Sequence, residues 1–355
     1  MLKPTPVFLM LMATLTCSAQ SPEQSDAGSA APPRTPTDLS QATPRVTSML
    51  LHDAFSLLNL TMAQERSLGM IEAKYPNMRE QVLEARKAFR AAFQPAIEAT
   101  DALMQVRDGA NWAQAKKLGE STLNALNSSA LTSEQAAEYI STVNRRAKGS
   151  MPHDIYVVLA ALHPDYLRHP ELELTRGYVQ EYKTDGSGKS LGLKLSIQYP
   201  TSWVAAEGRR PHILWKASSH DSYVSAMLLV KNTPTQLTSD NDTKEALGYL
   251  TSQEYLAHEA PGAAYVAAGQ TTIAGQPARY MDYEHVVSRK IGKDTVTMLM
   301  RGRYYVVIYG QTLIVFQADI TEAQGGSVEA VRDAFRKHEK LFDLMALSLD
   351  IYNRY

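Results

Sequence analysis

Apolar residues recur every three or four positions between Val46 and about His169, a spacing that is typical of amphipathic helices. A first predicted helix ends before Tyr75. A second begins near Pro76, because proline is tolerated in the first turn of a helix. Pro95 lies inside this second helix and is expected to kink it or divide it in two.

Three further helices are expected in this half of the chain. One covers Trp112 to Leu126, one opens at the capping box Thr132-Ser133-Glu134-Gln135 and closes at Gly149, and one covers about Asp154 to Leu162. The apolar stripe is wider than the two-in-seven seam of a coiled coil, which favours a self-contained helical bundle.

After His169-Pro170 the hydrophobic period changes to two, which predicts strands with one buried face. The expected strands cover residues 177–183, 191–199, 213–216 and 224–230. A helix follows from Thr243 to Glu259, with Asp242 available as its N-cap. A last helix is predicted from about Ser327 to Leu344.

The stretch from Tyr265 to Ile320 carries the strongest β pattern. Its apolar, tyrosine-rich runs are separated by Gly, Pro or charged turns, as in an antiparallel meander. Gly275 suits a turn that needs unusual backbone angles, and Pro277 can only start a strand or lie at an edge. Tyrosines that line a groove of this sheet would offer amphipathic contact to a peptide or protein.

The composition describes a globular protein of about two domains. The chain has 355 residues, of which 44% are hydrophobic and 21% charged, so a sizeable core can form. The formal net charge of −1 gives no electrostatic basis for binding nucleic acid, and we expect no nucleic-acid partner.

The N-terminus has the features of a secretory signal. Lys3 precedes an apolar run from Val7 to Ala13, and Ala19 offers a small residue at a cleavage point. The run is shorter than the roughly 20 residues that span a bilayer, so no transmembrane helix is expected in the mature chain. We therefore expect a secreted or periplasmic protein.

Cys17 is the only cysteine, and it allows two outcomes. Cleavage after Ala19 would release the chain, whereas lipid attachment to Cys17 would tether it to a membrane. Leu15 and Thr16 fit the lipoprotein pattern poorly. In either case the mature chain has no disulfide and no thiolate metal site.

These boundaries give a plan for the whole chain. It consists of a signal peptide (1–19), a disordered linker rich in proline and alanine (20–45), a helical domain (46–170) and a second domain (171–355).

Three short motifs in the second domain point to a known scaffold. An amphipathic strand runs into a Pro-x-x-Trp step over Leu195 to Trp203, and Ile273 to Tyr280 forms a Gly-Gln-Pro step between strands. A closing helix ends in the apolar sequence Leu341 to Leu349. Over about residues 175 to 352, the chain resembles the PsbP-like superfamily, which includes PsbP, the Ran-binding Mog proteins and DcrB-like bacterial lipoproteins.

This resemblance implies an α+β fold in which helices sandwich an antiparallel β-sheet, following the N-terminal helical bundle. It also implies a binding or assembly module that is not an enzyme. The superfamily shares no catalytic residues and no cofactor, so the resemblance supplies no catalytic, cofactor-binding or metal-binding residue to this chain.

Few residues of the sequence have the spacing of a reactive or metal-binding site. Glu254, His258 and Glu259 lie within about one helical turn, but two or three ligands on one helix leave a metal site incomplete. The segment 186–190 lies between strands and is predicted to be a hairpin turn. Arg209-Arg210, Arg289-Lys290 and Arg301-x-Arg303 are either a patch for an anionic partner or separate solubilising charges.

The leading hypothesis is a non-enzymatic bacterial envelope protein that binds another protein or an envelope component. One alternative is a hydrolase with a site between the two domains. Another is a lipoprotein chaperone for hydrophobic segments, which requires an exposed apolar face on the sheet.

Overall fold

The computed structural model describes residues 45–124, 131–233, 236–291, 294–323 and 327–352. Within these residues the chain forms two compact units. The helical unit comprises the described residues between 45 and 180 together with Tyr199–Trp203, and the sheet unit comprises Glu181–Gln198 and the described residues between 204 and 352. The predicted signal peptide, almost all of the linker and Cys17 lie outside the described residues.

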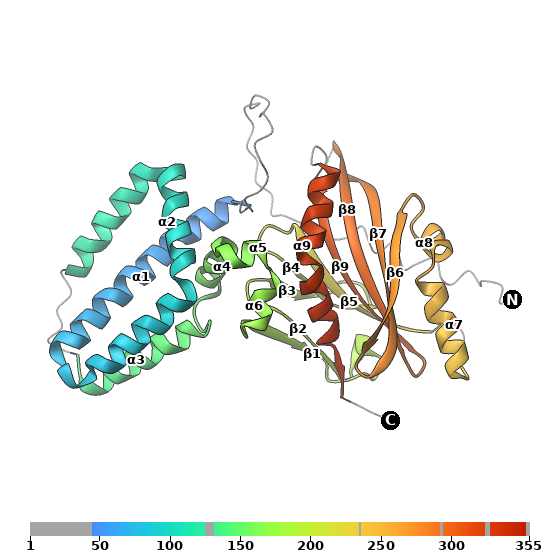
Figure 1. Cartoon of the computed structure of the whole chain (residues 1–355), viewed down its shortest axis with the longest axis horizontal. Coiled ribbons are helices and arrows are strands. Elements are labelled where there is room, and N and C mark those ends of the chain that lie inside the picture. The colour runs from blue at the N-terminus through green and yellow to red at the C-terminus, as the bar shows by residue number, and fades with distance from the viewer. Residues whose placement is uncertain (1–44, 125–130, 234–235, 292–293, 324–326, 353–355) are drawn as a thin grey trace. The chain divides into compact units, whose positions relative to one another are not determined.

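The helical unit matches the helical period of the first half of the chain (Figure 1). Its elements are α1 (Ser48–Lys74), the 3₁₀ turn η3 (Pro76–Met78), α2 (Arg79–Asn124), α3 (Ser133–Ala147), α4 (His153–Leu162), α5 (Pro164–Arg168) and α6 (Glu171–Thr175). The predicted capping box is confirmed, since Thr132 Oγ1 accepts from Gln135 N at 3.2 Å and Gln135 Oε1 accepts from Thr132 N at 2.9 Å.

The long helix α2 does not break where the sequence suggested. The prediction of a division at Pro95 is wrong, because the one residue of α2 with non-helical backbone angles is Asp108, with φ −150° and ψ 44°. Pro95 is exposed on the helix. At Asp108 the chain reverses and continues as the predicted shorter helix, whose Trp112 side chain returns to Asp101.

The core of the helical unit is aromatic and aliphatic. Helix α4 is buried almost all round, and its Tyr156 lies against Phe93, with ring centroids 6.2 Å apart. Phe93 also lies 5.6 Å from both Phe89 and Tyr178. These aromatic side chains therefore pack the interior of the bundle.

One carboxylate is buried in the same unit. Glu173 of α6 accepts a hydrogen bond from Ser202 N and another from Ser202 Oγ, both at 2.8 Å. It is 5% exposed, and desolvation raises the pKa of the Glu173 carboxyl to about 7 in spite of these hydrogen bonds.

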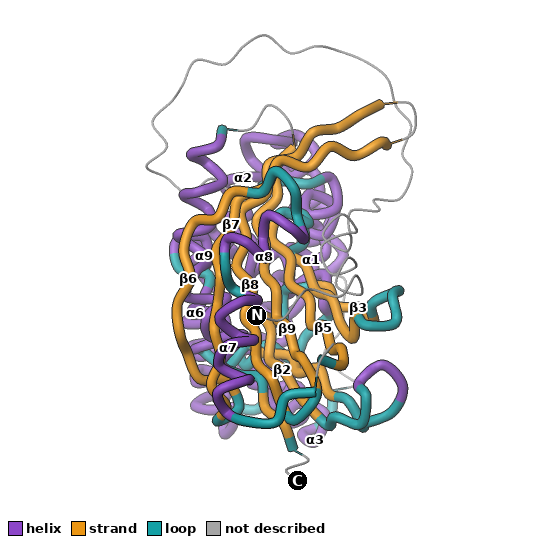
Figure 2. The backbone as a smooth tube through the Cα atoms, turned by 90° about the vertical axis from the view of Figure 1, so that its right-hand side faces the viewer, coloured by secondary structure: helices purple, strands orange, loops and turns teal. Residues whose placement is uncertain are grey.

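The sheet unit is built on seven antiparallel strands in the order β3-β4-β5-β9-β8-β7-β6 (Figure 2). They are β3 (Val204–Glu207), β4 (Ile213–Ser218), β5 (Val224–Asn232), β6 (Ala264–Ile273), β7 (Gln276–Ile291), β8 (Asp294–Tyr309) and β9 (Thr312–Ala323). A second sheet has the order β1-β2-β10 and consists of β1 (Val179–Lys183), β2 (Leu195–Pro200) and β10 (Asp350–Ile351).

The central meander agrees with the sequence prediction. Strands β6 to β9 follow one another as antiparallel neighbours. Ala274 and Gly275 join β6 to β7 with φ values of 52° and 75°, the positive values that glycine adopts most readily. Pro277 stands at the start of β7, opposite Thr272, as expected. The strand predicted from residue 191 begins later, because Leu191 has φ 53° and ends the 3₁₀ turn η4 (Gly188–Ser190).

Helices cover both faces of this sheet (Figure 1). On one face, Leu250 and Tyr255 pack in a core with Met281, Tyr283 and Tyr304 of β7 and β8. These two residues belong to α7 (Asp240–Leu250) and α8 (Gln253–Glu259), and α9 (Val328–Leu347) lies on the other face. The α+β fold class, with a helical bundle and a helix-covered antiparallel sheet, is thus confirmed.

The prediction of a single helix from Thr243 to Glu259 is wrong. The helix ends at Leu250 and α8 restarts after Ser252, whose hydroxyl accepts from Tyr255 N. Ser239, rather than Asp242, is the N-cap of α7, and the Asp242 carboxylate accepts from Ser239 N at 3.0 Å as its capping-box partner.

Candidate ligand-binding groove in the helical unit

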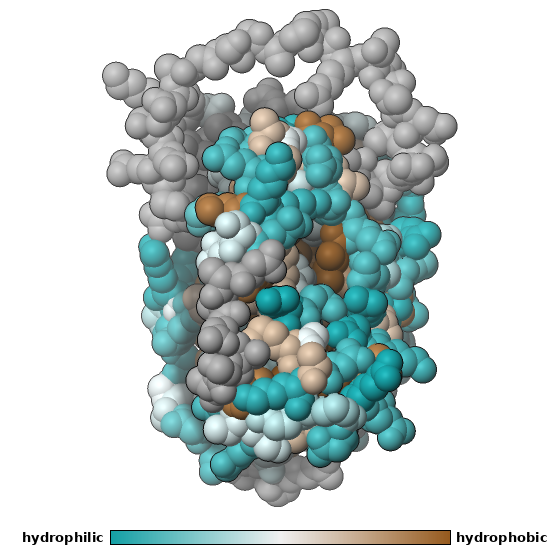
Figure 3. All heavy atoms as spheres, turned by 90° about the vertical axis from the view of Figure 1, so that its left-hand side faces the viewer, coloured by the Kyte–Doolittle hydropathy of each residue, from teal (hydrophilic) through white to brown (hydrophobic). Residues whose placement is uncertain are grey.

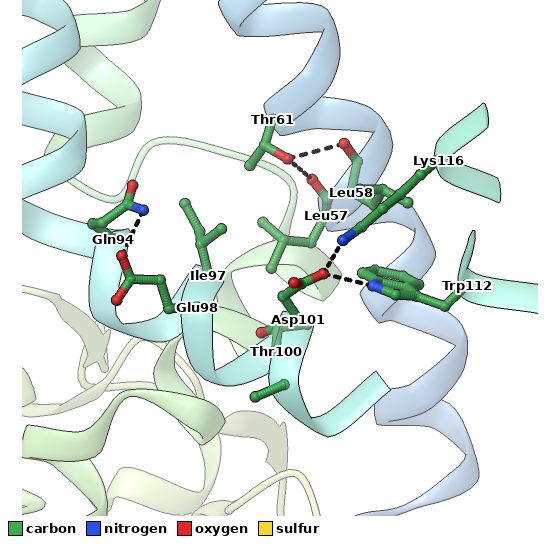
Figure 4. A pocket seen from close by; sticks show the side chains of 11 residues that line it. Leu57, Leu58, Thr61, Gln94, Ile97, Glu98, Thr100, Asp101, Trp112 and Lys116 are labelled. Atoms are coloured by element: carbon green, nitrogen blue, oxygen red, sulfur yellow. Dashed lines mark hydrogen bonds and ion pairs between the residues drawn. The ribbon is translucent and has the colours of Figure 1, made fainter. Parts of the chain in front are cut away.

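A groove lies between α1 and α2 in the helical unit (Figure 4). Its volume is about 400 Å³, which lies in the range of small-molecule and peptide side-chain sites. Its lining residues are Leu57, Leu58, Thr61, Gln94, Ile97, Glu98, Thr100, Asp101, Ala102, Trp112 and Lys116. On the side of the molecule seen in Figure 3, hydrophobic residues show in a recess bordered by hydrophilic ones.

The floor of the groove is apolar. Leu57 and Leu58 come from α1, whereas Ile97 comes from the first part of α2. Trp112 reaches the same place only because the chain reverses at Asp108. Its ring is fixed against Phe55 in an edge-to-face contact with centroids 5.2 Å apart.

One end of the groove carries an ion pair. Asp101 Oδ1 accepts a hydrogen bond from Trp112 Nε1 at 2.7 Å and another from Lys116 Nζ. Desolvation acts to raise the pKa of Asp101, but these hydrogen bonds and the Lys116 charge together hold that pKa below its usual value. The carboxylate is therefore ionised at neutral pH.

A second polar pair lies on the opposite side of Ile97 (Figure 4). Gln94 Nε2 donates to Glu98 Oε1 at 2.9 Å. The two groove hydroxyls donate back to their own helices, Thr61 to the carbonyls of Leu57 and Leu58 and Thr100 to that of Ala96. The groove lining contains no histidine, cysteine or serine.

The sequence did not reveal this groove. Its apolar residues have the helical spacing of ordinary core positions, and its two walls come from segments about 40 residues apart. The available local signal was Asp108-Gly109, because glycine within a helical pattern often marks a break.

Arg301 and Arg303 are neither a patch for an anionic partner nor solubilising surface charges. Arg303 is 4% exposed and donates to both oxygens of Asp282, at 2.5 and 2.9 Å. It also bonds Glu339 and Asp343 of α9, at 2.7 and 2.9 Å. Arg301 pairs with Glu284 at 2.8 Å. Arg303 thus links the sheet to α9, and the Arg301 guanidinium lies over the ring of Phe335 of α9, 4.9 Å from its centroid. The side chains of Arg289 and Lys290 lie outside the described residues.

A buried acid lies on the opposite face of the same strands. Asp319 accepts from Tyr283 OH at 2.5 Å and from Gln317 Nε2 at 3.0 Å. Desolvation raises the pKa of Asp319 to about 6 in spite of these bonds. Gly302 makes room for the pair, because a Cβ there would lie 2.3 Å from Asp319 Oδ1 and 2.5 Å from Tyr283 OH.

The other sequence candidates form no site. Glu259 is buried, with His258 Nδ1 3.4 Å from its carboxylate, and Glu254 is exposed. No group of three or more His, Cys, Asp or Glu side chains within the described ranges could hold a metal ion. The α7/α8 face of the sheet is buried at Met281, Tyr283 and Tyr304, so it is not the exposed apolar face that a chaperone would need.

None of the helices in the described part of the chain is long and apolar enough to cross a membrane.

Comparison with known proteins gives likeness in structure alone. No protein-family model matches the chain, and no curated protein matches it. Cyanobacterial PsbP from Synechocystis is 18% identical with a TM-score of 0.31, and the match covers 49% of this chain and 93% of that protein. LpqN of Mycobacterium tuberculosis, involved in cell envelope biogenesis, is 14% identical with a TM-score of 0.29 over 50% and 94% of the two chains.

The Ran-binding protein Mog1p of Saccharomyces cerevisiae is 11% identical with a TM-score of 0.31, over 49% of this chain and 95% of that one. The matched structures thus include PsbP and Mog proteins, the groups that the sequence resembles, over about half of the chain.

Proposed function

We propose that this chain is an exported, non-enzymatic binding protein whose helical unit holds a ligand in the groove between α1 and α2. The observation that carries the proposal is the groove itself. A cavity of about 400 Å³ has an apolar floor, and its charged and amide side chains stand in two pairs on either side of Ile97. An apolar floor with a few fixed polar groups is the usual construction of a ligand site.

The chemistry of the lining supports binding over catalysis. Asp101 is ionised and already engaged by Lys116 and Trp112, so it is a poor general base. Both threonine hydroxyls donate to helix carbonyls. If the chain were a hydrolase whose active site lay elsewhere, that activity would not explain this groove.

The test is a titration with N-phenyl-1-naphthylamine, a neutral apolar probe whose fluorescence rises on leaving water. We expect one saturable site on the full chain. Ile97→Phe fills the groove from its floor and should weaken probe binding at least tenfold. Leu83→Phe is the matched control, because Leu83 is an exposed aliphatic residue of α2 outside the groove lining. Equal binding to both variants would refute the proposal.

Export is the second part of the proposal and has its own measurement. Mass spectrometry of the mature protein from its host distinguishes two supporting results, a chain beginning at Gln20 and a chain with a lipid on Cys17. A mature chain that retains Met1 to Ala19 would contradict export.

A further inference from the structure

The polar ends of the groove have unused hydrogen-bonding capacity. Trp112 and Lys116 both donate to Asp101 Oδ1, and Oδ2 accepts no hydrogen bond from any described residue. Lys116 Nζ has three protons and bonds Asp101 alone among the described residues. This end therefore presents an acceptor and a donor side by side.

The other end has the same character. Gln94 gives one N–H to Glu98 Oε1, which leaves its own Oε1, its second N–H and Glu98 Oε2 for other partners. Figure 4 shows the two polar pairs on opposite sides of Ile97, with Leu57 beside the Asp101 end. Each end of the apolar floor thus offers both a donor and an acceptor.

The spacing of these ends matches a short stretch of polypeptide. Gln94 and Asp101 are seven residues apart on one helix, which corresponds to about 10 Å along its axis. An extended chain advances about 3.3 Å per residue, so the groove spans roughly three residues.

The charge of the groove selects among amphiphilic ligands. Its ionisable side chains are Glu98, Asp101 and Lys116, with a formal charge of −1. A fatty acid anion would meet a lysine that Asp101 already neutralises, together with a second carboxylate. A peptide backbone is neutral, and one extended residue presents on the same side an N–H for a carboxylate oxygen and a C=O for Lys116.

We propose that the groove binds a peptide segment, with one apolar side chain on the floor formed by Leu57 and Ile97. The backbone N–H of one residue donates to Asp101 Oδ2 and the C=O of the same residue accepts from Lys116 Nζ. An amide about three residues further along the segment bonds Gln94 and Glu98. This inference rests on the proposed function, because it names the ligand class of the same groove. Segments without acidic residues are preferred.

The test compares three small probes by NMR on the full chain. They are N-acetyl-leucine amide, its methyl ester, which lacks the terminal N–H, and the free acid. The reporter is the indole N–H resonance of Trp112, which is hydrogen-bonded to Asp101 and can be assigned from its absence in Trp112→Phe. We expect a saturable shift with the amide, about threefold weaker binding of the ester and at least tenfold weaker binding of the acid.

Two variants test the polar contacts separately. Lys116→Met keeps the aliphatic part of the side chain and should weaken binding of N-acetyl-leucine amide about fivefold. Acetylated trileucine amide, which is long enough to reach both ends, should bind several-fold more tightly than the single-residue probe, and Gln94→Ala should abolish this gain.

The outcomes separate the two proposals. If amide, ester and acid bind alike, or if the acid binds best, the peptide assignment is overturned. It is also overturned if neither variant changes amide binding. In each of these cases the groove stands as long as Ile97→Phe still blocks the naphthylamine probe. If that probe shows no Ile97-dependent site, the proposed function falls too.

Discussion

Replacement of Glu173 by Gln is expected to remove a pH dependence from the stability of the helical unit. Glu173 is buried, is bonded by Ser202 N and Oγ, and makes no ion pair with any described residue. Desolvation raises its pKa from 4.5 to about 7. The protonated form is thus favoured in the folded state relative to the unfolded state.

The size of the effect follows from proton linkage. Between about pH 4.5 and pH 7 the folded chain holds a proton on Glu173 that the unfolded chain has lost, so stability falls as the pH rises. Each unit of pKa difference corresponds to about 1.4 kcal/mol, which gives a loss of about 3 kcal/mol that is complete above pH 7. Below about pH 4.5 the Glu173 contribution no longer depends on pH.

The assay is urea unfolding of the full chain at several pH values from 4 to 8, followed by circular dichroism at 222 nm. The Glu173→Gln variant should lose less stability over this range than the parent chain, by about 3 kcal/mol. Glu80→Gln removes an exposed carboxylate from α2 and serves as the charge control. Parallel pH profiles for the parent chain and Glu173→Gln would refute the assignment.

Two predictions concern the sheet unit. Gly302→Ala should lower the free energy of unfolding by about 2 to 3 kcal/mol, because the Cβ of the new alanine would clash with Asp319 and Tyr283. Gly248→Ala on α7, where a Cβ meets nothing within 4 Å, should instead stabilise by about 0.5 to 1 kcal/mol, and thermal unfolding would detect both. Arg303→Leu should cost about 3 to 5 kcal/mol, because it leaves Asp282 buried and unpaired. The double variant Asp282→Leu/Arg303→Leu should recover most of the stability that Arg303→Leu loses, again measured by thermal unfolding. A double variant no more stable than Arg303→Leu alone would contradict the prediction.

Local signals in the sequence were enough for most of the fold. The capping box at Thr132 and the Gly275-Gln276-Pro277 step each depend on a few adjacent residues, and both have the expected geometry. Helix breaks were harder to place. Pro95 has the strongest breaking tendency but keeps its exposed position inside α2, whereas the reversal occurs at Asp108.

The groove and the buried charges depend on tertiary contacts, which the local pattern does not encode. Leu57 and Trp112 both have the spacing of core residues, and only the reversal at Asp108 brings them to one cavity. The residues next to Arg303 in the sequence give no sign that its charge is buried. Its partner Asp282 is opposite it in the β7–β8 register, and Asp343 comes from α9, 40 residues further on.

The most direct measurement of the central claim is photo-crosslinking of the full chain with N-acetyl-photoleucine amide, followed by tandem mass spectrometry of the labelled peptides. Labels should be concentrated between Leu57 and Thr61 of α1 and between Ile97 and Asp101 of α2. These labels should be lost in Ile97→Phe and kept in Leu83→Phe. Labels confined to the sheet unit, or labels in the groove that persist in Ile97→Phe, would contradict the central claim.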